Sequence, residues 1–562
     1  MTNRQFKADI VIKNGTIHTV DKDNRIVQAV AIKDNKIMAA GGNHEIDSFV
    51  DDSTKVIDAR GKSVIPGIID SHNHIWESGL LMSGLLTFSI GSITELKEKV
   101  KNRLSSMEKG AWLQGGSWIE TQFDEKRMPT RYDLDEVSVS NPVVLERIFG
   151  TCVVNSLALE AAGITKDIRV PEGGIIEMDP ITEEPNGILH GKAILLVREV
   201  MPGPFGSDDF GSGKGEPDID ILEKSIRYAI REYQKYGITG VVEPGVSPTI
   251  CRAYQNILSR DDLGMRVGLM PNWYGFTLNQ QMEKMERYID DIGVYSGFGN
   301  EWLRFSGLKM AIDGGLTSKT ALKSWPYKNE ESPREVNLRL DLDYLDEWVK
   351  KAHDSGWSVG IHVMGDIAVE KAVNAIYKAY KQNPVIRRHQ IIHAYYPTED
   401  SLAKMKEAGI IACIQGSFIY GEADGYDELL PEDKIVEFTP TKTYLNSGVT
   451  VALSTDMPCA DLNPFVNLYS IVTRKGIKGY QLGTKESVTV EEGLRMMTIN
   501  GAYLTEEHNL KGSIETGKLA DIAILNKNLK TIDNEEIKGI GVLCTILDGK
   551  IVFENDSDLE SN

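Results

Sequence analysis

Three polar side chains alternate along one apolar run near the N-terminus. The stretch "PGIIDSHNHIWESG", residues 66 to 79, places Asp70, His72 and His74 at every second position. Side chains at positions i, i+2 and i+4 of a β-strand point to one face, so these groups would share one space. Buried imidazoles without partners are unfavourable, and metal coordination removes that cost. The pattern therefore favours a metal site, in which Asp70 either orients a histidine or only caps the strand.

Further ligands would come from the ends of other strands, and four later residues have that position. Each terminates an apolar run that is followed by turn residues: Lys309 in "LRFSGLKMAIDGG", His362 in "GWSVGIHVMGD", His393 in "RHQIIHAYY" and Asp456 in "GVTVALSTDMP". Taken singly, a histidine at a strand end is more often structural, and a lysine is more often a surface charge. Their joint occurrence with His72 and His74 favours one shared site.

The elements that would position these residues alternate between helix and strand. In residues 219–243 the apolar positions fall on one helical face, Gly237 ends the helix, and "ITGVVE" begins a strand. Similar units recur at "YLDEWVKKAHDSGWSVGIHVMG", "DSLAKMKEAGIIACIQG" and "KTYLNSGVTVALSTDMP". Chemistry at the carboxyl ends of parallel strands is typical of a (β/α)8 TIM-like barrel. We predict this α/β fold for residues 66–505.

Both ends of the chain are rich in β-patterns. The pairs Asn14-Gly15 and Asp34-Asn35 lie between alternating apolar segments, a hairpin pattern, and the C-terminus repeats this style in "LADIAILNK" and "GVLCTILDGKIVFEN". We expect residues 1–65 and 506–562 to form one small β-sandwich domain. Residues 80–215 are less regular and end in a long Gly/Pro-rich tract, so we expect an inserted subdomain there.

Composition narrows the class of partner. The chain has 562 residues, a formal net charge of -20 and a pI near 5.1, which disfavour nucleic acid and anionic membranes as partners. No N-terminal signal segment and no run of 18 apolar residues is present, so a cytoplasmic location is expected. Five dispersed cysteines without a CxxC pair indicate reduced thiols. A small-molecule substrate is expected, and a homo-oligomer is compatible with the sequence.

Long motifs resemble a known family. The segments "ADIVIKNGTIHTVD", "DARGKSVIPGIIDSHNHI" and "GSIETGKLADIAILN" are similar to the amidohydrolase superfamily. The segments "LKMAIDGGLTSKTALKSWPY" and "WLQGGSWIETQFDEKRMPTRYDLDEV" resemble the branch that includes N-substituted formamide deformylases. The resemblance covers nearly the whole chain.

The resemblance implies a role for each candidate residue. His72 and His74 would bind one metal ion, carbamylated Lys309 would bridge to a second ion held by His362 and His393, and Asp456 would bind metal and handle the proton. One or two divalent ions are implied, and nitrogen and oxygen ligands favour zinc. The reaction would be hydrolysis of a non-peptide C–N bond, most simply in an N-acyl or N-formyl amide, by metal-activated hydroxide.

Some residues depart from that pattern or lack an assigned role. Thr151 stands where branch members often carry a histidine, and His190 stands where a carboxylate is expected, so both concern the substrate. Eight aromatic residues near predicted strand ends could line an apolar pocket: Trp76, Trp118, Trp273, Tyr274, Trp325, Tyr327, Phe418 and Tyr420. Among them, Trp325 and Tyr327 are the best candidates for the pocket walls. Cys459 is better explained as a structural cysteine than as a nucleophile. We expect four histidines to face solvent: His18, His44, His353 and His508.

Two other functions stay open. The same metal centre could serve deamination, cyclic-amide hydrolysis or decarboxylation, because one fold hosts many reactions. A non-catalytic regulatory protein could also retain the hydrolase scaffold. Asp456 distinguishes these two classes, since a scaffold has little reason to keep a carboxylate that handles protons.

Overall fold

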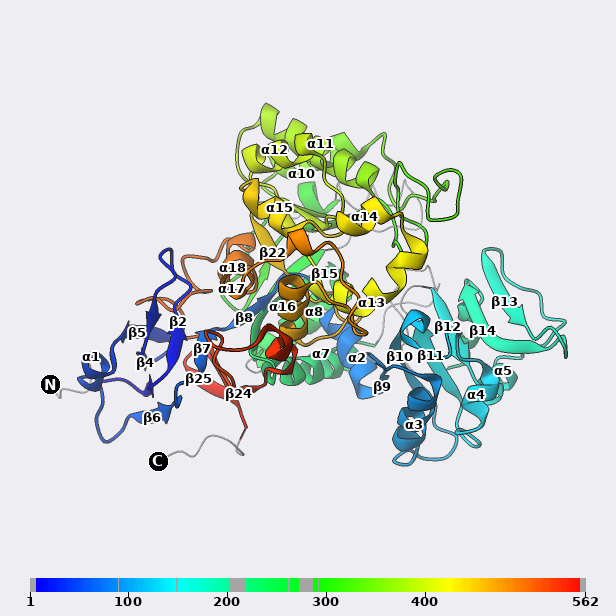
Figure 1. Ribbon diagram of the computed structural model, residues 1–562, viewed down its shortest axis with the longest axis horizontal. Helices are drawn as coiled ribbons and strands as arrows, with labels where there is room; N and C mark the ends of the chain where they lie inside the picture. Colours follow the sequence, from blue (N-terminus) through cyan, green and yellow to red (C-terminus); the bar gives the residue numbers. More distant parts are fainter. Residues whose placement is uncertain are drawn as a thin grey trace.

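The chain has an α/β fold with three β-rich parts arranged along its longest axis (Figure 1). Sheets from both chain ends lie on one side, parallel strands lie in the middle, and a separate sheet lies on the other side. The computed structural model describes residues 7–88, 90–147, 150–201, 218–260, 263–271, 287–291 and 293–555.

The helix and strand predicted for residues 219–243 are confirmed. Helix α7 (Ile219–Gln234) begins at Asp218, whose side chain accepts from the amide of Asp220, and buries the predicted apolar face. Gly237 follows with a φ of +75°, a conformation that glycine adopts without strain. Strand β15 (Ile238–Val246) is buried almost throughout, as strands covered on both faces are.

Nine parallel strands form two sheets in the middle of the molecule. The first sheet has the order β17 (Leu303–Phe305), β16 (Arg266–Pro271), β15 and β8 (Ile68–Asp70). The second has the order β18 (Leu308–Ala311), β19 (Val359–Val363), β20 (Gln390–His393), β21 (Ile411–Ile414) and β22 (Val451–Leu453). Every ladder within these two sheets is parallel.

The two parallel sheets meet at both edges. Strands β17 and β18 are separated by only two residues, Ser306 and Gly307. At the other edge, the amide of Asp456 donates to the carbonyl oxygen of His72 at 3.0 Å, and the amide of His74 donates to that of Met457 at 2.9 Å. The loops that follow β8 and β22 are thus held together.

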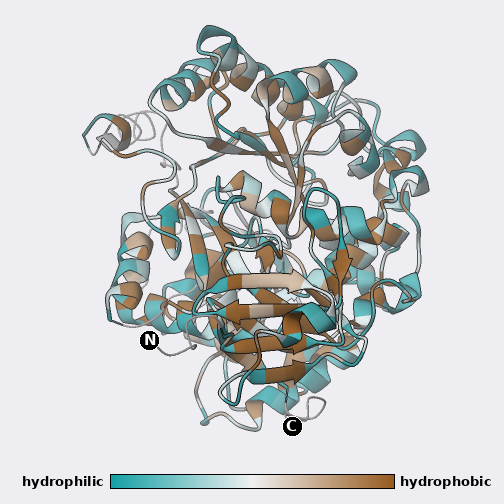
Figure 2. Cartoon of the chain, turned by 90° about the vertical axis from the view of Figure 1, so that its left-hand side faces the viewer, coloured by the Kyte–Doolittle hydropathy of each residue, from teal (hydrophilic) through white to brown (hydrophobic). Residues whose placement is uncertain are grey.

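Helices alternate with these strands and carry hydrophilic residues on their outer surfaces, whereas the strands are hydrophobic (Figure 2). Besides α7, the helices that follow these strands along the chain are α2 (Ile75–Ser83), α8 (Pro248–Arg260), α10 (Leu345–Asp354), α11 (Asp366–Gln382), α12 (Glu399–Ala408), α13 (Gly416–Leu429), α15 (Thr441–Asn446), α16 (Pro464–Thr473), α17 (Val490–Met496) and α18 (Ile499–Leu504). Within the described residues, no helix combines the length and apolarity that crossing a bilayer requires.

A six-stranded sheet with its own two hydrophobic clusters occupies residues 85–191. Its order is β13 (Gly174–Met178), β14 (Pro185–Gly191), β12 (Thr151–Val154), β11 (Val143–Arg147), β10 (Leu113–Trp118) and β9 (Leu85–Leu86). The helices beside it are α3 (Ile93–Leu104), α4 (Arg131–Asp135), α5 (Ser156–Ala161) and α6 (Ile194–Arg198). The Gly/Pro-rich tract predicted at 201–217 lies outside the described residues except for Met201.

Strands from both termini combine in two sheets. One has the order β5 (Lys36–Gly41), β4 (Ala29–Lys33), β1 (Ile10–Lys13) and β6 (Lys55–Asp58). The other has the order β25 (Lys550–Glu554), β24 (Val542–Leu547), β23 (Ile522–Leu525), β7 (Ser63–Pro66), β2 (Thr16–His18) and β3 (Ile26–Val27). One hydrophobic cluster contains residues of both sheets. The short helix α1 (Asn43–Asp47) packs against β4 and β5, whereas α14 (Glu432–Val436) lies away from these sheets, next to α13 (Figure 1).

Of the two predicted hairpins, one is confirmed. Asp34-Asn35 joins the antiparallel strands β4 and β5. Asn14-Gly15 instead carries the chain from one sheet to the other, because β1 pairs with β4 and β6 while β2 pairs with β3 and β7.

Candidate metal centre

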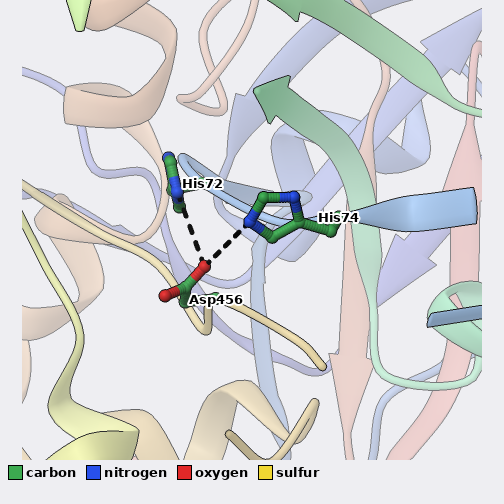
Figure 3. Close-up of side chains that lie close together, drawn as sticks. All are labelled: His72, His74 and Asp456. Atoms are coloured by element: carbon green, nitrogen blue, oxygen red, sulfur yellow. Dashed lines mark ion pairs between the residues drawn. The ribbon is translucent and has the colours of Figure 1, made fainter. Parts of the chain in front are cut away.

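His72, His74 and Asp456 converge at the end of the parallel strands (Figure 3). One ligand atom from each lies within 4.8 Å of the other two. Asp456 Oδ1 is 3.4 Å from His72 Nε2 and 3.3 Å from His74 Nε2. His72 and Asp456 are almost fully buried, and His74 is partly exposed.

Asp70 acts as a cap that joins two strand ends. Its carboxylate accepts from the backbone amides of His72, at 3.4 Å, and Thr455, at 3.0 Å, and from the side chains of Asn73 and Thr455. Asn73 in turn accepts from the hydroxyl of Tyr233 at 2.6 Å. These hydrogen bonds support the interpretation of Asp70 as a strand-end cap. The same network holds His72 and Asp456 side by side.

The structure also brings Lys309, His362 and His393 to this place. Lys309 Nζ is 3.3 Å from His72 Nε2, and His393 Nε2 is 2.9 Å from His362 Nδ1. His393 Nε2 lies 4.0 Å from Asp456 Oδ2. All six residues predicted from strand ends therefore gather in one buried cluster.

Second partners fix how the two later histidines face this cluster. His393 Nδ1 lies 2.7 Å from Gln415 Oε1, and the Gln415 amide nitrogen donates to the carbonyl oxygen of Cys413. Because a carbonyl can only accept, the oxygen of Gln415 must face His393, which therefore donates from Nδ1. His362 Nε2 similarly lies 3.3 Å from the carbonyl oxygen of Gly314. The two remaining ring nitrogens, His393 Nε2 and His362 Nδ1, are then both acceptors, and they face each other.

The donor set fits a cation. Two imidazole lone pairs 2.9 Å apart repel each other unless a proton or a metal ion shares them. Asp456 Oδ1 is buried and has no hydrogen-bond partner among the described residues. Imidazole nitrogens with a carboxylate oxygen are the ligands that zinc and similar divalent ions prefer.

Burial and neighbouring charge set the protonation of the cluster. Burial, followed by the positive charge of Lys309, holds the pKa of His72 well below its ordinary value, and burial with the charge of His393 does the same for His362. Burial lowers the pKa of His393 to about 4. At His74, burial also opposes protonation, but Asp456 and Glu77 outweigh it and raise the pKa to about 9. Three of the four imidazoles are thus neutral, as metal ligands are.

The backbone is strained at two of these residues. His393 and Asp456 have φ values of +69° and +58°, in the left-handed region that non-glycine residues rarely occupy. Such strain persists where surrounding contacts hold it and is common at functional sites.

Two supporting residues were absent from the sequence prediction. Gln415 directly follows the apolar run of β21, the same position that identified the predicted ligands. Its amide side chain is not a usual metal ligand, so the sequence pattern did not single it out. Asp313 lies on the loop that follows β18, the strand of Lys309, and accepts from the backbone amides of Leu322, Met364 and Gly365. Burial raises the pKa of Asp313 to about 7 despite these hydrogen bonds.

The aromatic candidates divide between separate places. Trp325 and Tyr327 belong to a hydrophobic cluster with Tyr395, Tyr396 and Phe418, and the last of these lies 5.8 Å from the ring of His393. We call this group, together with its other members, the aromatic cluster. Trp76 and Trp118 lie in other clusters, and Trp273 and Tyr274 lie outside the described residues.

Two departures from the family pattern contact each other. Thr151 Oγ1 lies 2.9 Å from His190 Nδ1 on the neighbouring strand, and His190 Nε2 lies 2.7 Å from Glu177. Both lie on the separate sheet, where β12 pairs antiparallel with β14 and Thr151 stands opposite His190.

The prediction that four histidines face solvent is wrong for two of them. His18 is buried against Ser63, and His353 is fully buried, with Nδ1 2.9 Å from His389 Nε2. His44 is exposed as predicted, and His508 is half-buried. Position 353 lies on the apolar face of α10, so helical spacing accounts for its burial.

Comparison with known proteins adds independent information. The sequence pattern described as the amidohydrolase family matches residues 55–553. The chain is 27% identical over 566 residues to N-substituted formamide deformylase of Arthrobacter pascens, covering 97% of this chain and 98% of that protein. It is 28% identical over 561 residues to protein LONG AFTER FAR-RED 3 of Arabidopsis thaliana, covering 97% and 92% respectively.

A solved structure shares the fold. The crystal structure of an uncharacterized metal-dependent hydrolase from Pyrococcus horikoshii OT3 matches with a TM-score of 0.70 and 22% identity. The match covers 94% of this chain and 99% of that one.

Proposed function

The chain belongs to the amidohydrolase family and is a hydrolase of C–N bonds, and on that premise we propose that it cleaves an N-acyl or N-formyl amide of a small molecule. The observation that carries the proposal is the meeting of His72, His74 and Asp456 within 4.8 Å of one another. These residues come from opposite ends of the sequence, and the hydrogen-bond network of Asp70 holds them together.

We propose that the two parallel sheets form one (β/α)8 barrel, in which β17 and β18 are two parts of the fourth strand. The hydrogen bonds between the loops after β8 and β22 support closure. On this proposal residues 66–505 are the catalytic barrel, interrupted by the inserted subdomain at about 80–215. Residues 1–65 and 506–562 form a β-sandwich, which the shared cluster of their two sheets supports.

The ligand assignment is the one that the family resemblance implies, and the closeness of the six residues supports it. His72, His74 and Asp456 would hold one divalent ion, and His362 and His393 would hold a second, with zinc favoured by the nitrogen and oxygen donors. Lys309 would bridge the ions as a carbamate, because an ammonium cannot ligate a cation whereas carbamate oxygens can. When bound, such ions act as Lewis acids that lower the pKa of water and polarise the attacked carbonyl group.

The residues of the chain perform the proton transfers. Asp456 accepts a proton from the attacking water at a carboxylate oxygen and then donates it to the leaving nitrogen. The C–N bond breaks, and a carboxylic acid and an amine are released. His72 and His393 stay neutral because burial disfavours their charged forms. The aromatic cluster limits the access of bulk water beside His393.

The name of the Arthrobacter relative favours a formamide among the N-acyl amides. Deamination, cyclic-amide hydrolysis and decarboxylation would use the same residues. The products that each reaction releases distinguish them from hydrolysis of an acyclic amide. A regulatory role without catalysis is disfavoured by the position of Asp456, whose carboxylate faces His72 and His74, the two histidines that follow β8.

A direct assay tests this function. Protein purified with zinc and bicarbonate is incubated with a panel of N-formyl and N-acetyl amines, and the amine and acid products are quantified. We expect stoichiometric release of both products from at least one class, and loss of this release in Asp456→Asn. Intact amides in this panel, with release of ammonia from aminated heterocycles, ring opening of cyclic amides or release of carbon dioxide from carboxylated compounds instead, would assign the site to one of the other reactions.

A further inference from the structure

A buried lysine beside the aromatic cluster has no carboxylate partner among the described residues. Lys323 is 4% exposed, and no described Asp or Glu oxygen lies within 4.0 Å of its Nζ. Its Nζ donates to the carbonyl oxygen of Trp325 and lies 4.1 Å from the ring centroid of Trp325 and 3.6 Å from that of Tyr327. Buried lysines are rare unless an anion neutralises them.

The nearest acidic side chains are engaged elsewhere. Glu330 binds Arg334 at 2.7 Å and Lys319 at 3.1 Å. Asp366 accepts from the amide and the hydroxyl of Ser324. The positive charge of Lys323 is therefore left to aromatic faces and one carbonyl group, and burial lowers the pKa of this lysine to about 8.

Two neutral donors beside this lysine lack an acceptor among the described residues. Trp325 Nε1 and Tyr396 Oη have no hydrogen-bond partner among the described residues, although the side chains are only 9% and 5% exposed. The rings of Trp325 and Tyr396 touch, with centroids 5.2 Å apart. The hydroxyl of Tyr327 differs, because it donates to the carbonyl oxygen of Leu316 at 3.1 Å.

The position of these donors connects them to the metal centre. Tyr395 and Tyr396 follow His393 after one intervening residue, Ala394, and the rings of His393 and Tyr395 lie 6.3 Å apart. Lys323 and Trp325 lie on the loop after the strand of Lys309, and Asp313 anchors that loop by accepting from the amide of Leu322 at 2.8 Å. Trp325 is thus linked to His393 by three ring contacts, through Tyr396 and Tyr395.

We propose that Lys323, Trp325 and Tyr396 form a carboxylate-binding subsite, so that the preferred substrate is an amide whose organic group ends in a carboxylate. That the bound molecule is a substrate rests on the proposed function, whereas binding of a carboxylate at this subsite does not depend on catalysis. An ammonium and two neutral donors that lack an acceptor match an acceptor-only anion. The faces of Trp325 and Tyr327 would cover the aliphatic part of the ligand.

Matched substrates test the subsite. Hydrolysis of ω-formamidoalkanoates of increasing chain length is compared with that of N-alkylformamides of the same length. We expect the wild-type protein to prefer the carboxylates, and Lys323→Met to lower their kcat/KM by roughly ten- to a hundredfold while neutral amides change less than about twofold. Equal loss for both series would overturn the subsite.

Lys319→Met is the matched control. Lys319 also lies over the ring of Tyr327, at 5.3 Å, but it is more exposed and is paired with Glu330. Its replacement should leave the carboxylate preference unchanged. Tyr396→Phe removes one unpartnered donor and keeps the phenyl ring, so it should lower kcat/KM for the carboxylates alone by about three- to tenfold, without a lower Tm. Trp325→Phe removes the other donor but also shrinks a buried ring, so its effect is judged by comparing the two substrate series rather than by Tm. Unchanged kinetics in both would mean that these donors bind no ligand.

A binding measurement separates this inference from the proposed reaction. Methanesulfonamide analogues of the two series carry a sulfur atom in place of the acyl carbon that would be attacked. Their binding to the metal-loaded protein is measured by calorimetry. Tighter binding of the carboxylate analogue, lost in Lys323→Met, supports the subsite even if no formamide is hydrolysed. Equal binding of charged and neutral analogues to the wild-type protein contradicts it even if formamides are hydrolysed.

Discussion

His72 and Asp456 are joined through both backbone and side chains, although they are far apart in the sequence. The amide of Asp456 donates to the carbonyl oxygen of His72 at 3.0 Å, and Asp456 Oδ1 lies 3.4 Å from His72 Nε2. The backbone bond fixes the distance between the two loops, and the side chains can then share one ion. Folding alone thus prepares the site.

This arrangement predicts that Asp456→Asn separates activity from stability. The backbone hydrogen bond and the side-chain volume remain, so Tm should change little, whereas loss of the proton acceptor should lower kcat/KM by about a hundredfold or more. Product release and thermal unfolding are measured on the same preparation. Asp400→Asn, on an exposed ion pair of α12, serves as the control. Retained activity in Asp456→Asn would remove this residue from the proton transfers.

Gln415 should control metal affinity without touching the ion. Gln415→Met removes the acceptor for His393 Nδ1, which frees the ring to change its tautomer, and the affinity for zinc should fall about ten- to a hundredfold. Gln415→Glu keeps an acceptor at that position and should lose less. Competition with a chromophoric chelator measures both variants. Equal losses would show that the orientation of His393 does not depend on this hydrogen bond.

The buried histidine pair at the other end of the strands should make folding sensitive to acid. The amide of Val359 donates to His389 Nδ1, so His389 donates from Nε2 to His353 Nδ1, and the latter ring donates to the carbonyl oxygen of Asn383. Burial lowers the pKa of His389 from 6.5 to about 3. Between pH 6.5 and about 3, His389 is protonated in the unfolded chain but neutral in the folded chain. The free energy of unfolding therefore decreases as the pH falls below 6.5.

Urea unfolding at pH 7.5 and pH 5.5 measures this effect. His389→Gln should lose less stability on acidification than the wild-type protein, by at most about 1.4 kcal/mol per pH unit. His44→Gln, at an exposed histidine, should behave as wild type. The same acid sensitivity in all three proteins would assign it to other groups.

A buried ion pair joins the parallel strands to the terminal sheet. Arg266 on β16 binds Asp521 at 2.7 Å and Asp548 at 2.9 Å, and Arg266 and Asp521 are nearly inaccessible to solvent. Arg266→Met leaves buried carboxylates unpaired, so it should lower the free energy of unfolding by about 3 kcal/mol or more. Lys404→Met, on an exposed pair with Asp400, should cost less than about 1 kcal/mol. Similar costs in the two variants would contradict a special role for the buried pair.

The sequence predicts the six clustered residues, but it does not predict the residues that hold them in place, such as Gln415 and Asp313. Ligand-type side chains at strand ends indicate Lys309, His362, His393 and Asp456, because parallel strands bring their carboxyl ends together. Gln415 has the same position but is not an expected ligand, so its role emerges only from contacts. Asp313 accepts three backbone amides of distant segments, and no local pattern predicts such a set.

Long-range pairing also limits the fold prediction. Asn14-Gly15 and Asp34-Asn35 carry similar turn signals, but only the second joins paired strands, because β2 binds β7 from beyond residue 60. His353 shows the opposite case. Its burial follows from the apolar spacing of α10, which a closer application of helical periodicity would have predicted.

The central claim is that the six clustered residues hold two divalent ions through a modified Lys309. The most direct test is metal analysis of protein prepared with zinc, with and without bicarbonate, for the wild-type chain and Lys309→Ala. Our account predicts about two ions per wild-type chain with bicarbonate and a sharp fall in the variant. A single ion, or none, that is indifferent to both bicarbonate and Lys309 would contradict the proposed bridged centre.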